Sequence, residues 1–209
     1  MSNLDKLIAH FEKFPGIGGR QARRFAFHIL TMAPERVNEL TGLMQNLQST
    51  VRTCTSCQRF FAQNNSNNTL CTICSDTNRD HGKLLVVSHD TDIQAIERSG
   101  LYDGLYFVLG GMVPLLNATE DTRLRSGALK AIVTERQAEL TEIILAFAVN
   151  PDGENTARYV TSILTPLFTD TTTPPTISEL GRGLSTGSEL EYADPETLKN
   201  ALRNRGWFI

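Results

Sequence analysis

The sequence predicts an α/β protein in several parts: a helical N-terminal unit, a short cysteine-bounded segment, a parallel-sheet domain, and a C-terminal strand and helix. Three observations support this. Apolar residues recur every three or four positions through the first fifty residues, as in amphipathic helices. All four cysteines fall between residues 54 and 74. After residue 82, short apolar runs alternate with helical patterns, which is typical of a parallel sheet with crossover helices.

The composition is that of an ordinary globular protein, with 40% hydrophobic and 21% charged residues. No run of eighteen apolar residues is present and the N-terminus does not resemble a secretory signal, so we expect a cytoplasmic protein without a membrane span. The net charge of -3 argues against a protein that coats nucleic acid by bulk attraction. Residues 1–60 nevertheless carry a net +4 and the remainder -7, which suggests that the N-terminal part meets a polyanion.

The first fifty residues predict a compact helical unit. An apolar stripe over residues 3–14 is that of an amphipathic helix, and Pro15–Gly19 ends it. A second helical pattern covers residues 22–30. Pro34 then opens a third helical pattern that runs to Val51.

The cysteines form two Cys-x2-Cys pairs separated by thirteen residues, Cys54 with Cys57 and Cys71 with Cys74. This spacing predicts one structural zinc ion held by four thiolates, with no open position for catalysis. Two disulfides are disfavoured because nothing marks the chain as secreted, and four unconnected cysteines would not be paired in spacing. The Asn-rich stretch at 64–68 has no apolar residue and predicts an exposed loop.

The glycine turn after the first helix predicts a phosphate-binding site. Gly16 and Gly18 allow backbone N–H groups to be exposed at the start of the second helix, where the helix dipole favours an anion. Arg20, Arg23 and Arg24 follow in that helix's first turns, so together they are expected to bind the DNA backbone without reading sequence. The alternative is a plain helical hairpin with a solvated arginine face.

The α/β part is expected to alternate strands with helices. The predicted strands are Leu84–Val87, Tyr106–Leu109 and Ile143–Ala148, and the predicted helices are 90–98, 123–138 and 154–168. A Thr- and Pro-rich connector follows. Beyond it we expect a strand at Thr176–Leu180, a Gly-rich turn at Gly181–Gly187 and a final helix at Pro195–Asn204.

This domain is similar to the Toprim fold of topoisomerases, primases and some nucleases. That chemistry requires a carboxylate at the end of the first strand and an acidic pair that holds Mg²⁺. The first-strand position is Ser88, which cannot ionise near neutral pH, so the general acid/base is absent unless His89 or Asp90 replaces it. Asp152 and Glu154 supply an acidic pair, which could equally complement the dipole of a helix N-terminus.

The whole order of parts resembles the RecR family of bacterial recombination mediators, over essentially the full chain. The matching residues are Pro15-Gly16-Ile17-Gly18 with Ala26-Phe27-His28, both Cys-x2-Cys pairs, Ile93 with Ala95-Ile96-Glu97-Arg98, Tyr106 to Gly111 with Pro114-Leu115, Gly153-Glu154 with Thr156-Ala157, Arg182-Gly183-Leu184 through Gly187-Ser188, and Leu190-Glu191-Tyr192-Ala193-Asp194. The last of these segments is the most specific.

The resemblance implies a non-enzymatic protein that forms a ring-like dimer or tetramer around DNA. With RecO, and in some pathways RecF, such a protein helps RecA displace single-strand binding protein. It also implies a nucleoid-associated location in a bacterial cytoplasm. Arg20 and Arg24 match the family's DNA-contacting positions, and Asp152 with Glu154 match an acidic pair that contacts RecO.

The resemblance also divides the chain into four parts. A helix-hairpin-helix domain is expected at 1–53, a four-cysteine zinc finger at 54–80, a Toprim domain at 81–170, and a Walker-B-like segment with a helix at 171–209. The chain departs from the family in its longer spacing between the cysteine pairs, in Ser88 where a glutamate is favoured, in the segment Ala148–Glu154, and in Glu179, which replaces an arginine. A Mg²⁺-dependent Toprim nuclease or primase is the rival hypothesis. The four histidines, His10, His28, His81 and His89, have no ligand spacing.

Overall fold

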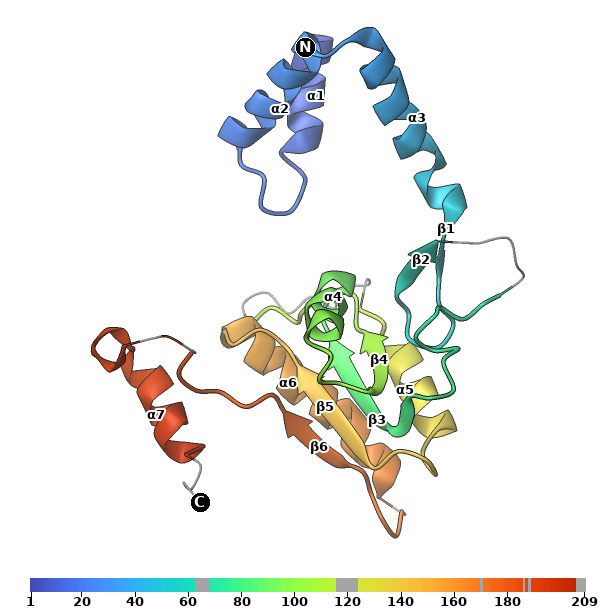
Figure 1. Ribbon diagram of the computed structural model, residues 1–209, viewed down its shortest axis with the longest axis vertical. Helices are drawn as coiled ribbons and strands as arrows, with labels where there is room; N and C mark the ends of the chain where they lie inside the picture. The colour runs from blue at the N-terminus through green and yellow to red at the C-terminus, as the bar shows by residue number, and fades with distance from the viewer. Residues whose placement is uncertain (63–67, 116–123, 170, 186, 188, 206–209) are drawn as a thin grey trace. The chain divides into compact units, whose positions relative to one another are not determined.

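The computed structural model of the protein describes residues 1–62, 68–115, 124–169, 171–185, 187 and 189–205 (Figure 1). Two compact units are present. Met1–Arg52 make up most of the first unit, and the second contains Thr53–Phe61 and the chain from residue 68 onward. None of the helices in the described ranges is both long and apolar enough to cross a membrane. The predicted Asn-rich loop at 64–68 lies, except for Asn68, outside the described residues.

The first unit is helical, as predicted, and begins with a helical hairpin. Helix α1 (Asn3–Phe11) packs against α2 (Gly19–Thr31), with Ala22 and Ala26 fully buried between them. The Phe11 and Phe25 rings meet edge to face with their centroids 6.0 Å apart, which adds a directional contact to this small core. Helix α1 ends at Phe11 rather than residue 14 because hydrogen bonds from the N–H of Lys13 and of Phe14 to carbonyls three residues earlier close a tight turn.

Helix α3 (Pro34–Thr50) completes the first unit and has none of its residues buried. Its apolar side chains are instead open to solvent, with Leu43 64% and Leu47 60% exposed. Met44 is also exposed. A seventeen-residue helix with this apolar stripe has an unsatisfied packing face, which is unusual in a stable monomer.

The second unit is built on a four-stranded parallel sheet, which confirms the predicted fold class. The strand order is β4-β3-β5-β6, and Leu85 of the central strand pairs with Tyr106 on one side and Ile144 on the other. The sheet strands are β3 (Asp80–Val87), β4 (Gly104–Val108), β5 (Glu142–Ala146) and β6 (Thr176–Glu179). The apolar ends of β3 and all of β4 are buried, as expected of strands covered on both faces.

Helices connect these strands and supply the rest of the core. They are α4 (Asp90–Ser99), α5 (Ser126–Glu135) and α6 (Pro151–Leu164), with the 3-10 turn η1 (Thr165–Phe168) after α6. Leu129 and Val133 of α5 and Val160 of α6 are buried against the sheet. After β6, the chain continues through the 3-10 turn η2 (Leu190–Tyr192) to α7 (Pro195–Arg203).

Helix α6 starts three residues earlier than the sequence pattern predicts. The Asn150 side chain accepts a hydrogen bond from the Gly153 N–H at 2.8 Å, and Pro151 occupies the first helical position. Both are strong helix-start features, because a side-chain oxygen satisfies an otherwise free N–H and proline fixes a helical φ. The start of α6 places Asp152 and Glu154 in the first helical turn.

A hydrogen-bonded network joins the start of β3 to α4 and β4. The Arg79 guanidinium donates to both carboxylate oxygens of Glu97, and the Tyr106 hydroxyl donates to the same carboxylate at 2.6 Å. The hydrogen bonds from Arg79, and then from Tyr106, hold the pKa of Glu97 below its usual value of 4.5.

Glu97→Gln should therefore destabilise the protein at neutral pH but not in acid. A carboxylate with a lowered pKa stabilises the folded state fully above its unfolded-state pKa, and this contribution is lost as the pH falls through the folded-state value. We expect a loss of about 1–2 kcal/mol at pH 7. Denaturant titrations of the unmodified protein and of the Glu97→Gln variant, from pH 7 down to acid, measure the difference in their free energies of unfolding. Glu135→Gln, at an exposed position, is the control. A difference that does not change with pH would contradict the role given to the Glu97 charge.

Candidate functional site

The four cysteines are brought together by the fold into one cluster. Their Sγ atoms all lie within 4.8 Å of one another, and the Sγ atoms of Cys57 and Cys71 are 3.6 Å apart. Four sulfurs bound at about 2.3 Å around a tetrahedral zinc ion would lie about 3.8 Å apart, so the donor set fits this metal. None of the four cysteines is disulfide-bonded to another in the structure. Within the described part of the chain, the cluster consists of these four cysteines and includes no histidine.

Two matching turns aim the thiols at a common point. The N–H of Gln58 donates to the carbonyl of Cys54, and the N–H of Ser75 donates to that of Cys71, so each pair closes the same kind of turn. Gln58 lies in the left-handed region with φ 63°, which lets the chain turn back after the first pair. The N–H of Cys71 also donates to Cys54 Sγ at 3.4 Å. The turns therefore hold the four sulfurs in an arrangement that is compatible with a metal site.

The cysteine segment is anchored to the sheet domain by hydrogen bonds that its backbone carbonyls accept. The Val108 N–H donates to the Cys57 carbonyl at 2.8 Å, and Arg125 Nη1 donates to the Gln58 carbonyl at 2.6 Å. The guanidinium of Arg125 also lies over the ring of Phe60, with 5.4 Å between its central carbon and the ring centroid. Sequence reasoning did not identify Arg125, because Gln58 and Phe60 lie more than sixty residues away in the chain.

Strand β3, the first strand of the parallel sheet, is not followed by a carboxylate that is free to act as the Toprim acid. Ser88 is only 4% exposed at the end of β3. Asp90, one of the two possible replacements, instead accepts a hydrogen bond from the Phe60 N–H at 2.6 Å and so ties the cysteine segment to the start of α4. His89 precedes α4 as its N-cap residue, and its N–H donates to Asp92 at 2.8 Å.

The acidic residues of α6 are both engaged within the protein. Asp152 Oδ1 accepts a hydrogen bond from the Leu115 N–H at 2.9 Å. Glu154 Oε1 accepts one from Arg182 Nη1 at 2.7 Å. The two carboxylates therefore face different partners, one on each side of the helix start. This arrangement differs from the freely available acidic pair that holds Mg²⁺ in a Toprim enzyme.

The glycine hairpin presents an exposed cationic helix face. Gly16 has φ 75°, a left-handed conformation that favours glycine. Gly18 caps α2 without any side-chain hydrogen bond, so the first N–H groups of the helix remain for another acceptor. Arg20, Arg23 and Arg24 of α2 are all exposed, whereas Ala22 and Ala26 are buried. The structure brings all five predicted residues into one turn and its following helix.

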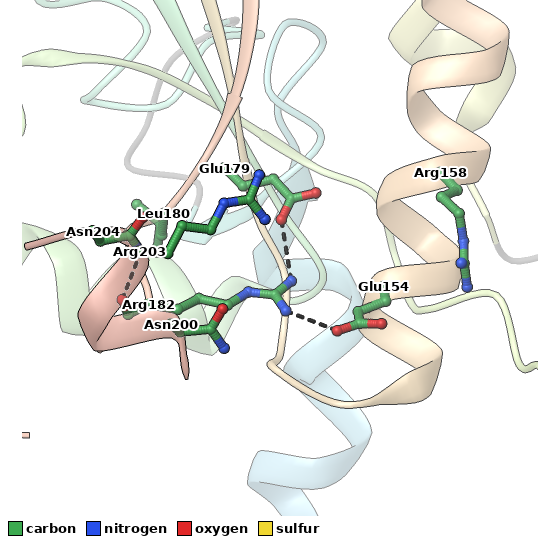
Figure 2. Close-up of a pocket in the computed structure, with 9 residues that line it drawn as sticks. Glu154, Arg158, Glu179, Leu180, Arg182, Asn200, Arg203 and Asn204 are labelled. Atoms are coloured by element: carbon green, nitrogen blue, oxygen red, sulfur yellow. Dashed lines mark hydrogen bonds and ion pairs between the residues drawn. The ribbon is translucent and has the colours of Figure 1, made fainter. Parts of the chain in front are cut away.

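A polar pocket of about 460 Å³ lies where the chain leaves β6 (Figure 2). Arg182 lies at its centre and donates to Glu154 on α6 and to Glu179 at the end of β6. Arg158 and Arg203 also line it. Sequence reasoning identified Arg182 only as part of a matching segment and gave it no contact.

The comparisons with known proteins agree with this architecture. The family models described as "RecR, helix-hairpin-helix", "Toprim domain" and "RecR, C-terminal" match residues 4–48, 82–173 and 183–205. The chain is 37% identical to the protein named "Recombination protein RecR" of Mycobacterium tuberculosis, over 97% of this chain and 96% of the relative. The chain belongs to the RecR family. Proteins of the same name from Mycobacterium leprae and Streptococcus thermophilus are 36% and 35% identical, each over 97% of this chain and 96% of the relative.

Membership in the RecR family confirms the resemblance that the sequence motifs indicated. It associates the chain with recombination and DNA repair, in keeping with the printed name of these relatives. The RecR helix-hairpin-helix match covers the glycine turn and the arginines of α2, and the Toprim match covers Ser88 and the acidic residues of α6. The four-cysteine cluster is compatible with a metal site in the segment between these two matches.

Proposed function

We propose that this protein is a non-enzymatic, DNA-binding recombination mediator that acts with RecO, and in some pathways RecF, to help load RecA on single-stranded DNA. The observation that carries the proposal is the state of the Toprim carboxylates. Ser88 replaces the first-strand acid, Asp90 is hydrogen-bonded to Phe60, and the acidic pair of α6 is engaged with Leu115 and Arg182. With Ser88 in place of the acid and Asp90 hydrogen-bonded to Phe60, the described part of the domain lacks the first-strand carboxylate that phosphoryl transfer requires.

The rival hypothesis is a Mg²⁺-dependent nuclease or primase, and it can be tested directly. The pure protein is incubated with end-labelled single- and double-stranded DNA and Mg²⁺. The proposal predicts intact strands at all times. Cleavage that disappears in the Asp152→Asn variant would mean that the Toprim carboxylates are catalytic, and the mediator proposal would fail.

DNA binding is assigned to the hairpin and the arginine face of α2. The phosphate would be held by Arg20, Arg23 and Arg24 together with the N–H groups of the first two helical residues, Gly19 and Arg20. The other parts of the chain carry a net negative charge, which favours this unit as the place where a polyanion binds.

The double variant Arg20→Ala with Arg24→Ala should lose most of its DNA affinity. Each phosphate contact contributes about one unit to the slope of log affinity against log salt, so the slope should flatten by about two units. Fluorescence anisotropy with a labelled oligonucleotide across a salt series measures both quantities. The matched control is Lys130→Ala with Lys199→Ala, which removes two exposed charges outside the hairpin. Unchanged binding in the arginine variant, or an equal loss in the control, would contradict the assignment.

The metal is proposed to be one structural Zn²⁺ per chain, held by Cys54, Cys57, Cys71 and Cys74. Tetrahedral all-sulfur sites favour zinc or iron–sulfur chemistry, and four protein ligands leave no position for a reacting water. The division into parts at 1–53, 54–80, 81–170 and 171–209, and a bacterial cytoplasmic location near the nucleoid, belong to the same proposal.

A homo-oligomer, ring-like and either dimeric or tetrameric, is also proposed. The apolar stripe of α3 supports it, because Leu43, Met44 and Leu47 are exposed on a helix that buries no residue in its own unit. A second copy is the simplest partner for such a face. Light scattering with and without DNA tests this, and a monomer under all conditions would contradict it.

A further inference from the structure

The Arg182 side chain connects the C-terminal part of the chain to the proposed partner site. Its Nη1 donates to Glu154 Oε1 at 2.7 Å and its Nη2 donates to Glu179 Oε2 at 3.1 Å (Figure 2). These hydrogen bonds, the one to Glu154 foremost, raise the pKa of the Arg182 guanidinium above its already high value. One of the two carboxylates at the start of α6 is therefore neutralised by a cation of the protein itself.

The residues after Arg182 depend on this contact. We use "C-terminal segment" for residues 180–185 and 189–205, which include α7. The side chain of Asn204 donates to the Arg182 carbonyl at 2.8 Å and so ties the end of α7 to Arg182. Among the described residues, the side-chain hydrogen bonds from this segment to the rest of the domain are the two that Arg182 makes.

Apolar packing adds little to hold the C-terminal segment in place. Leu190, Tyr192 and Leu202 are largely exposed, and a polar pocket of about 460 Å³ separates α7 from α6. A region with few buried apolar contacts opens at a low free-energy cost. The segment can therefore be displaced without unfolding the sheet domain.

The Arg182 ion pairs themselves can also exchange. The side chains of Arg182 and Glu154 are 25% and 45% exposed, and partly exposed ion pairs contribute little to stability. If Glu154 were taken by another cation, Arg182 would keep Glu179, so neither charge would be left buried and unpaired. A guanidinium of a partner protein would donate to Glu154 in the same geometry as Arg182 does.

We propose that Glu154 exchanges Arg182 for an arginine or lysine of the protein partner, so that partner binding at the start of α6 detaches the C-terminal segment from α6. The inference rests on the proposed function and on the resemblance to the RecR family, which implies that Asp152 and Glu154 contact RecO. It adds that the partner presents a basic surface and that Arg182 competes with this surface. The N-terminal end of α6 is thus both a docking surface and the point where the partner controls the C-terminal segment.

Binding of the purified RecO partner to three variants tests the exchange. Arg182→Gln removes the internal competitor and should tighten binding about threefold to fivefold, because the lost ion pair is a weak one. Glu154→Gln removes the shared carboxylate and should weaken binding. Lys199→Gln is the matched control, since it removes one exposed positive charge from α7. The ion pair of Lys199 is with Glu196 of the same helix, not with Glu154.

The affinities of these variants test the partner site at Glu154 and the exchange of Arg182 separately. If Glu154→Gln leaves the affinity unchanged, the proposed partner site is wrong and the inference fails with it. If Glu154→Gln weakens binding but Arg182→Gln tightens it no more than Lys199→Gln does, the partner site stands and the exchange is wrong. Thermal unfolding of each variant excludes a loss of fold as the cause.

Hydrogen exchange gives an independent measurement on the unmodified chain. A nine-residue helix is marginal in water on its own, so the backbone amides of α7 should exchange faster when the partner binds and releases the segment. Amides of β3 should not change. Slower or equal exchange in α7 on partner binding would overturn the proposal.

Discussion

Replacing Cys57 by serine is expected to remove the proposed zinc ion and to lower the free energy of unfolding of the sheet domain by more than about 4 kcal/mol. Structural zinc binds with an apparent free energy of about 10–16 kcal/mol, and this energy stabilises the fold because the site exists only in the folded chain. The loss should reach the sheet domain, since the Cys57 carbonyl accepts a hydrogen bond from Val108 and the Gln58 carbonyl accepts one from Arg125.

Metal analysis of the purified protein and denaturant titrations measure these two effects. Thr72→Ala is the control, because Thr72 is an exposed residue between Cys71 and Cys74 and its side chain is not a ligand. A chelator should destabilise the unmodified protein in the same way, whereas a thiol reductant should not. Sensitivity to the reductant alone would mean that disulfides, and not a metal, hold the segment together.

Gly153→Ala is expected to destabilise the protein by about 3–5 kcal/mol. A Cβ atom at this position would lie 1.9 Å from the carbonyl oxygen of Ala148, a distance that no conformation of the added methyl group can relieve. Either the start of α6 or the chain after β5 must move. A shift of α6 would also disturb the hydrogen bond from Leu115 to Asp152 and the one from Arg182 to Glu154.

The matched control is Gly127→Ala in α5. A Cβ atom there meets nothing within 4 Å, so alanine should stabilise that helix by about 0.5–1 kcal/mol through its higher helix propensity. Thermal and denaturant unfolding of the two variants should therefore change in opposite directions. Equal stability of the Gly153 variant and the unmodified protein would show that the chain around Ala148 is not packed as described.

Local patterns were sufficient to predict most of the fold. The Cys-x2-Cys pairs indicated a metal cluster because each pair closes its own turn, and the buried strands could be recognised as continuous apolar runs. The start of α6 was missed although its signal is local: Asn150 followed by Pro151 is a helix-start pattern.

The contacts that define the site were not predictable in the same way. Arg182 and Glu154 are 28 residues apart, and Arg125 and Gln58 are 67 apart, so no spacing along the chain connects either pair. Asp90 was considered as a replacement acid, and its hydrogen bond to Phe60 depends on how the cysteine segment docks. Such contacts follow from tertiary packing, which a single sequence does not specify residue by residue.

The most direct test of the mediator proposal is RecA assembly on single-stranded DNA that is coated with single-strand binding protein. RecA, RecO and Mg²⁺ are present, and the assembly rate is measured with and without this protein. We predict that the protein accelerates assembly while the DNA strands stay intact, and that the variant with Arg20→Ala and Arg24→Ala does not. No acceleration by the unmodified protein, or acceleration that requires cut strands, would contradict the proposal.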